Sequence, residues 1–225
     1  MTFSIIGRCP ETGQLGIAIS SSSIAVGARC PWARAGVGAV STQNITLPAL
    51  GPQILDLLAH QHLQPDAALD KALTSNGWSQ YRQVTVLDAS GRIALFSGKE
   101  SLGVHNAVKG EQCVAAGNLL SDVRVIEAMV GAFEAEPGQL ADRLLAAMHA
   151  AMAAGGEAGP VHSAALKVVG DHTWPIIDLR VDWAEEDPIG QLDGLWQAYR
   201  PQMQDYLTRA LNPTTAPSYG VPGDE

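Results

Sequence analysis

Thr2 has the residue type and position with the clearest chemical meaning in this sequence. Its small side chain permits removal of Met1, after which Thr2 carries the free α-amino group of the chain. A threonine hydroxyl is a weak nucleophile because it keeps its proton at neutral pH, whereas an α-amine titrates near about 7.7–8.0 and can accept that proton. A single residue then supplies the nucleophile and the general base. The sequence therefore indicates acyl transfer by Thr2, provided that Thr2 begins a strand inside the fold.

Motifs for other chemistries are missing or incomplete. There is no Gly-x-Ser-x-Gly motif and no phosphate-binding loop, and Gly36-Val37-Gly38 lacks the third glycine of a dinucleotide-binding motif. His60 and His62 are separated by one residue at an expected helix end, so their rings diverge, and no set of cysteines or carboxylates completes a metal site. Cys30 and Cys113 are better explained as small buried residues than as nucleophiles. We expect neither a metal nor a cofactor.

The composition describes an acidic globular protein. The chain has 225 residues, of which 46% are hydrophobic and 16% charged, and its net charge is −9. The 14 basic residues are scattered, so no basic face is available for nucleic acid or for an anionic membrane. No apolar run is long enough to span a bilayer, the first residues lack the features of a secretory signal, and the 3 cysteines follow no disulfide or zinc pattern. We therefore expect a cytoplasmic protein that binds neither nucleic acid nor membranes.

Thr2 is expected to begin a β-strand. Residues 2–8 alternate in polarity and end at the Pro/Gly turn of residues 9–14, and residues 15–21 form the second strand of a hairpin. Further strands are predicted at residues 37–43, 83–87, 92–96, 112–116, 163–169 and 175–181. Helices are predicted at residues 50–61, from Pro65 to Asn76-Gly77, after a cap at Ser121, over residues 140–152, and from Pro188 with a break at Pro201.

Blocks of strands alternate with pairs of helices in this order. Such an order favours two packed sheets covered by helix layers. We therefore predict an α+β fold, a four-layer αββα sandwich whose two sheets are mainly antiparallel. One domain is expected over residues 1–211, followed by a loose tail of residues 212–225 that is rich in Pro, Thr and Gly. The aromatic residues from Trp196 to Tyr206 are expected in the core or at a subunit contact.

Several segments together resemble the family called domain of unknown function 1028 (DUF1028). They are residues 1–8, 10–21, 25–28, 31–33 and 35–43, His105 with Gly110, Gly117-Asn118-Leu119-Leu120, and residues 163–166 and 178–182. The resemblance extends over roughly residues 2–200 in the family's order. That family is grouped with the amino-terminal-nucleophile (Ntn) hydrolases. The resemblance therefore implies the αββα fold, a nucleophile at the first residue of the mature chain, and hydrolysis of an amide bond through an acyl-enzyme.

The resemblance also implies catalytic roles around Thr2. Ser20 and Ser21 correspond to the strand end where a polar residue orients the terminal amine; the alternative is that they bind only backbone. Gln43, with the amides of its strand end, is expected to stabilise an oxyanion, or else it simply ends the strand. Asn118 is expected to donate at the pocket, because the preceding glycine lets the backbone approach closely, or else it forms a turn before the next helix.

Ser21 and the remaining matched positions are expected to bind substrate. Asn44 follows Gln43 at the strand end, and His105 either contacts substrate or is an ordinary loop histidine. Arg8 is either a clamp for a carboxylate or a structural charge partner, and the same alternatives apply to Arg29. The sequence departs from the family's pattern at Gly159-Pro160-Val161-His162, where a lysine is common, and at Ser22-Ser23-Ile24, where bulkier residues are common. Both departures are expected to alter substrate preference.

Together these observations predict a metal-independent amidohydrolase that acts on a small amide or ureido compound. We expect a homo-oligomer, a dimer or higher. Two alternatives remain open at this point: a non-catalytic binding or scaffold protein on the same fold, and a hydrolase of short peptides or peptidoglycan fragments. Retention of Met1 would favour the binding protein, because it keeps the Thr2 nitrogen in a peptide bond.

Overall fold

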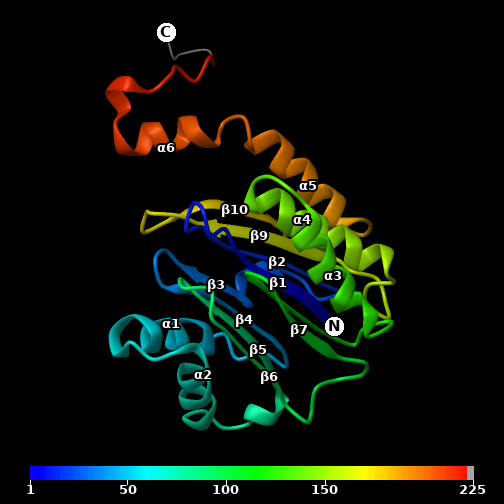
Figure 1. Cartoon of the computed structure of the whole chain (residues 1–225). Coiled ribbons are helices and arrows are strands. Elements are labelled where there is room, and N and C mark those ends of the chain that lie inside the picture. The colour runs from blue at the N-terminus through cyan, green and yellow to red at the C-terminus, as the bar shows by residue number, and fades with distance from the viewer. Residues whose placement is uncertain (222–225) are drawn as a thin grey trace.

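Two antiparallel sheets lie face to face in the computed structural model, which describes residues 1–221 (Figure 1). The larger sheet has six strands in the order β10-β9-β2-β1-β8-β7, and the smaller sheet has four in the order β3-β4-β5-β6. The strands of the larger sheet are β1 (Thr2–Arg8), β2 (Leu15–Ser21), β7 (Asn106–Gly110), β8 (Cys113–Asn118), β9 (Ser163–Val169) and β10 (Pro175–Val181). Those of the smaller sheet are β3 (Pro31–Arg34), β4 (Gly38–Asn44), β5 (Arg82–Asp88) and β6 (Ile93–Ser97).

Helices cover the outer face of each sheet. Helices α1 (Leu50–Gln61) and α2 (Pro65–Thr74) pack on the smaller sheet, whereas α3 (Arg124–Ala135), α4 (Leu140–Ala153) and α5 (Pro188–Tyr199) pack on the larger one (Figure 1). Helix α6 (Met203–Leu211) follows α5 and extends beyond the edge strand β10. None of the described helices is long and apolar enough to cross a membrane.

The central strand β1 divides its side chains between two cores. Successive side chains of a strand point to opposite faces of the sheet. Phe3 and Ile5 belong to the core beneath α3 and α4, whereas Ile6 lies between the sheets with Leu87 of β5. Thr2 has the same parity as Ile6. The fold therefore directs the Thr2 side chain toward the space between the two sheets.

Two glycines let α3 approach the larger sheet closely. A Cβ at Gly7 of β1 would lie 2.4 Å from Cε2 of Phe133, and a Cβ at Gly117 of β8 would lie 2.9 Å from Cδ1 of Ile126. These distances are shorter than a carbon–carbon contact allows. Glycine at both positions therefore brings the helix onto the strands that carry Thr2 and Asn118.

The expected mixture of helices and two antiparallel sheets is confirmed, and so is the hairpin of β1 and β2. The helix break near Pro201 also occurs, between α5 and α6. Two strands, β3 and β7, were not predicted; both lie at a sheet edge. The expected cap at Ser121 is wrong, because α3 begins at Arg124 and the backbone N–H of Arg124 donates to Asp122 Oδ1 at 2.8 Å. Of the expected tail, residues 222–225 lie outside the described residues, and the division into one domain and a tail stays a prediction.

Candidate functional site

Thr2 is buried at the end of the central strand of the larger sheet. It pairs with Asn118 on β8, it lies beside Ser21 on β2, and only 5% of its surface is exposed. Thr2 Oγ1 lies 3.3 Å from Ser21 Oγ. The hydroxyls of Thr2 and Ser21 each donate to the carbonyl oxygen of Met1 at 2.5 Å. Two hydroxyl groups therefore converge on one carbonyl group at this strand end.

Ser21 connects Thr2 to a guanidinium group at the rim of the site. Ser21 Oγ lies 2.8 Å from Ser23 Oγ, and Arg29 Nη2 donates to Ser23 Oγ at 3.0 Å. Arg29 Nη1 donates to the carbonyl oxygen of Ala25 at 3.1 Å. The loop after β2 is therefore held by Arg29, and a chain of hydroxyls leads from this cation to Thr2.

A second polar network lies between the sheets, centred on Gln83 of β5. Gln83 Oε1 accepts from Gln43 Nε2 at 2.9 Å and from Asn118 Nδ2 at 3.1 Å, and Gln83 Nε2 donates to the carbonyl oxygen of Gly117 at 3.0 Å. Gln43 Oε1 accepts from Ser4 Oγ at 2.7 Å. These side chains are buried, so their hydrogen bonds fix one arrangement of the polar groups beside Thr2.

Asn118 keeps one polar atom without a partner. Its Oδ1 is buried and accepts no hydrogen bond, although its Nδ2 is held by Gln83. A buried acceptor without a donor costs about 1–3 kcal/mol of stability. Because Asn118 is the residue opposite Thr2, this oxygen is placed to accept a hydrogen bond from a group bound at the strand end.

Glu157 supplies a buried carboxyl group next to Ser22, the residue that follows Ser21. It is 5% exposed, Oε2 accepts from the backbone N–H of Ser22 at 3.3 Å, and Oε1 has no partner. Burial raises the pKa of Glu157 from 4.5 to about 8, and the positive α-amine of Met1 acts in the opposite direction. The carboxyl group therefore holds a proton at neutral pH unless a cation binds beside it.

Sequence reasoning missed Glu157 and the role of Gln83. Glu157 follows Gly155-Gly156, a pattern that indicates only the end of a helix. Gln83 is the second residue of β5 and directly precedes the mainly apolar residues 84–87, and an inward-facing amide beside such residues was the available signal for a buried polar network. Neither residue can be placed near Thr2 without the pairing of distant strands.

The structure brings Ser21 and Asn118 next to Thr2, and it joins Gln43 to them through Gln83. Ser20 lies on the opposite face of β2 and donates to the carbonyl oxygen of Ser163 at 2.9 Å. It therefore does not orient a group at Thr2.

Asn44 and His105 have structural contacts outside the Thr2 cluster. Asn44 Nδ2 donates to the carbonyl oxygen of Tyr81 at 2.7 Å, and Asn44 Oδ1 accepts from the backbone N–H of Leu102 at 3.2 Å. His105 is exposed, and its Nδ1 lies 3.1 Å from the carbonyl oxygen of Gly103. Asn44 thus ties two loops together, and His105 remains a loop histidine outside the network.

Arg8 lies at the far end of β1 from Thr2. At about 3.3 Å per residue, the strand from Thr2 to Arg8 separates them by about 20 Å. Arg8 Nε donates to the carbonyl oxygen of Ala89 and Arg8 Nη1 donates to Gln112 Oε1, each at 2.8 Å. The expectation that Arg8 binds substrate together with Thr2 is therefore corrected: this side chain joins the turns at the other end of the sheets.

Two buried thiols can be set aside as nucleophiles. Burial raises the pKa of Cys30 to about 11 and that of Cys113 to about 12. A thiol attacks as its thiolate, and these groups stay protonated near neutral pH.

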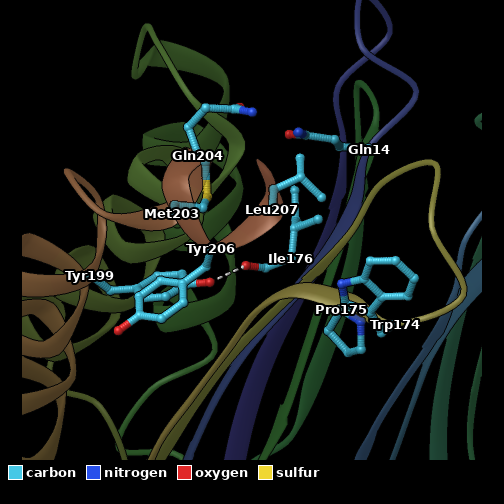
Figure 2. A pocket seen from close by; sticks show the side chains of 9 residues that line it. All are labelled: Gln14, Trp174, Pro175, Ile176, Tyr199, Met203, Gln204, Tyr206 and Leu207. Atoms are coloured by element: carbon cyan, nitrogen blue, oxygen red, sulfur yellow. Dashed lines mark hydrogen bonds between the residues drawn. The ribbon is translucent and has the colours of Figure 1, made fainter. Parts of the chain in front are cut away.

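A separate cavity of about 350 Å³ lies between β10 and α6 (Figure 2). Tyr199 and Tyr206 line it, and Tyr199 Oη donates to the carbonyl oxygen of Ile176 at 2.9 Å. The strand register places this cavity at the Arg8 end of the larger sheet, because Pro175 aligns across the strands with residues 169, 15 and 8. The cavity is thus remote from Thr2.

The aromatic residues from Trp196 to Tyr206, expected in the core or at a subunit contact, have two different locations. Trp196 is fully buried, and Tyr199 and Tyr206 line the cavity.

Comparisons with known proteins identify a family. The model of the family of unknown function DUF1028 matches residues 2–192. A crystal structure of a protein from Silicibacter pomeroyi, described by the same family, is 32% identical over 88% of this chain and 88% of that chain, with a TM-score of 0.82.

The comparison with solved structures also returned two structures of Anbu (ancestral beta-subunit) at low similarity. Anbu from Yersinia bercovieri is 11% identical, with 90% of this chain and 96% of that chain covered and a TM-score of 0.43. Anbu from Hyphomicrobium sp. strain MC1 is 10% identical, with 92% and 98% covered and a TM-score of 0.41. No curated protein matches the sequence. The family model and the structure from Silicibacter pomeroyi show that this chain belongs to the DUF1028 family.

Proposed function

We propose that this protein is an Ntn-type hydrolase that cleaves the C–N bond of a small amide or ureido compound, with Thr2 as nucleophile after removal of Met1. The observation that carries the proposal is the convergence of the Thr2 and Ser21 hydroxyls on the carbonyl oxygen of Met1. After removal of Met1, a substrate carbonyl bound beside the free Thr2 amine, shifted from the position of the Met1 carbonyl, would lie within reach of Thr2 Oγ1 and of a second hydrogen-bond donor.

The proposed reaction uses one residue as nucleophile and base. The α-amine of Thr2 accepts the hydroxyl proton while Oγ1 attacks the substrate carbonyl carbon. Ser21 Oγ donates to the oxyanion of the tetrahedral intermediate. The Thr2 ammonium then returns the proton to the leaving nitrogen, the C–N bond breaks, and water hydrolyses the resulting ester. Asn118 Oδ1 is proposed to accept a hydrogen bond from the Thr2 amine, which would give this buried atom its missing partner.

The arrangement of the elements supports the same proposal. The two antiparallel sheets lie between two sets of helices, and this arrangement supports the proposed αββα architecture of the Ntn-hydrolase type. Thr2 begins the central strand, and Gln43, Gln83 and Asn118 give the adjacent space a fixed polar wall. The proposal needs neither a metal nor a cofactor, because the amine and the hydroxyls supply proton transfer and oxyanion stabilisation.

Covalent labelling tests this proposal directly. An epoxyketone that reacts with both a hydroxyl and an adjacent free amine should form one adduct on the wild-type protein, mapped to Thr2. Intact mass should show that the labelled chains have lost Met1. Ser4 and Ser21 serve as internal controls, since both are buried hydroxyls without a free amine. Labelling of these serines instead of Thr2, or no labelling of chains that lack Met1, would contradict the proposed nucleophile.

A further inference from the structure

Met1 lies beside the place where the proposed function puts the acyl half of a substrate. Its carbonyl oxygen meets the hydroxyls of Thr2 and Ser21. Its side chain lies against Gly159, where an added Cβ would come within 3.1 Å of Met1 Cε. Its positive α-amine lowers the pKa of Glu157 electrostatically, although the two groups lie beyond ion-pair distance. The carbonyl group and the side chain of one aminoacyl group thus have defined contacts in this site, and its α-amine lies within electrostatic range of a buried carboxyl group.

Glu157 lacks a strong partner for its carboxyl group. Oε2 accepts one hydrogen bond, from the Ser22 amide at 3.3 Å, and Oε1 accepts none although the residue is 5% exposed. Among the described residues, no lysine, arginine or amine lies within ion-pair distance of Glu157. The nearby guanidinium of Arg29 is held by Ser23 and backbone carbonyls. A buried carboxyl group in such surroundings is stabilised by a donor that a ligand brings.

We infer that Glu157 recognises a protonated amine on the acyl half of the substrate, so that the substrates are α-amino-acyl amides with an apolar side chain facing Gly159. This inference rests on the proposed function for the orientation of the substrate. An ammonium group fits better than a neutral amide because it supplies both an N–H donor and the charge that a buried carboxylate needs. Gly159 leaves room for the side chain because it has no Cβ.

A matched pair of probes tests the inference without catalysis. Leucinamide and 4-methylpentanamide differ by the α-amine alone. Their affinities for the full-length Thr2→Ala protein, confirmed by mass to lack Met1, can be measured by calorimetry or ligand-observed NMR. We expect leucinamide to bind about 10- to 100-fold more tightly, as a charge-assisted hydrogen bond predicts. Equal affinities, or no binding of leucinamide, would overturn the inference.

Substitution of the carboxyl group assigns the preference to Glu157. In the Thr2→Ala background, Glu157→Gln should remove the preference for leucinamide and leave the affinity for 4-methylpentanamide within about twofold. Glu136→Gln, at an exposed glutamate, is the matched control and should keep the preference. If Glu157→Gln still prefers leucinamide to 4-methylpentanamide, the assignment of amine recognition to Glu157 is wrong. If Glu157→Gln does not fold, the comparison of the two probes on the protein that retains Glu157 still decides whether an ammonium group is recognised.

Turnover by the wild-type protein separates this inference from the proposed function. A Glu157-dependent preference for leucinamide without hydrolysis or labelling of Thr2 would refute the hydrolase and retain the amine site. Hydrolysis of 4-methylpentanamide as efficient as that of leucinamide would retain the hydrolase and refute the amine site.

Discussion

Asn118 of the larger sheet donates to Gln83 Oε1 of the smaller sheet at 3.1 Å, beside the strand end that carries Thr2. The same oxygen accepts from Gln43, so a single buried amide joins three strands from two sheets. Elsewhere the two sheets also meet through an apolar cluster that includes Ile6 and Leu87. The polar network is therefore a local feature of the Thr2 end, where it both links the sheets and forms the wall of the candidate site.

Loss of the Gln83 side-chain amide should destabilise the protein. Gln83→Leu keeps the size of the side chain but leaves Gln43 Nε2 and Asn118 Nδ2 without their shared acceptor. Each buried group that loses its partner costs about 1–3 kcal/mol. Urea unfolding should therefore show a free energy of unfolding lower by about 2–4 kcal/mol. The control Gln204→Leu, at an exposed glutamine, should change the free energy of unfolding by less than about 0.5 kcal/mol. A similar loss of stability in both variants would contradict a special role of the network.

Replacement of Thr2 should separate catalysis from stability. Thr2→Val preserves the shape and removes the hydroxyl, and its turnover of any amide that the wild-type protein cleaves should fall by at least about 10³-fold. Thr2→Ser keeps a hydroxyl next to the amine and should retain measurable turnover. Steady-state kinetics with intact-mass checks on Met1 removal measure both effects. Undiminished turnover by Thr2→Val would rule out Thr2 as the nucleophile.

Stability should depend on pH through Glu157. In the chain that carries Met1, the folded pKa of this carboxyl group is raised from 4.5 to about 8, so the folded state binds a proton that the unfolded state has lost. The free energy of unfolding should therefore fall as pH rises from about 4.5 to about 8. Glu157→Gln should remove this slope. Thermal unfolding of both proteins across that range measures the difference, and parallel curves would show that Glu157 does not titrate in the way described.

Two glycine substitutions should act in opposite directions. Gly7→Ala forces a Cβ to within 2.4 Å of Phe133, so it should cost about 1–3 kcal/mol of stability through overpacking. Gly131→Ala lies in α3 with no atom within 4 Å of the added Cβ, and it should stabilise the protein by about 0.5–1 kcal/mol because alanine favours the helix. Chemical denaturation of both variants checks the contrast. Equal changes in the free energy of unfolding of the two variants would mean that the close approach of α3 to β1 is not a tight packing constraint.

Much of the fold could be predicted from local patterns, because strong turns and amphipathic helices are encoded within a few residues. The hairpin of β1 and β2 and the start of α2 at Pro65 are examples. Strand β3 was missed because it has four residues and begins with a proline, which suits an edge strand. Strand β7 was missed because it is short and half-exposed, so it lacks a clear alternation.

The candidate site could be predicted only in part. Thr2 could be proposed from the sequence because its expected chemistry depends on its own hydroxyl and amine. Ser20 and Ser21 could not be told apart by residue type; strand parity places Ser21 beside Thr2 and turns Ser20 away. An isolated β-bridge pairs Glu157 with Leu120 and so holds Glu157 near the site. No local sequence pattern reveals this contact between distant segments.

The position of Thr2 at the tip of a buried strand affects how the protein should be produced. An affinity tag fused ahead of Met1 would hold the Thr2 nitrogen in an amide and direct extra residues past Glu157 and Gly159. We expect a protein purified with such a tag to show no hydrolysis, whatever the activity of the native protein. Helix α6 lies at the opposite edge of the molecule from this strand tip, so a fusion placed after α6 would leave the tip free (Figure 1).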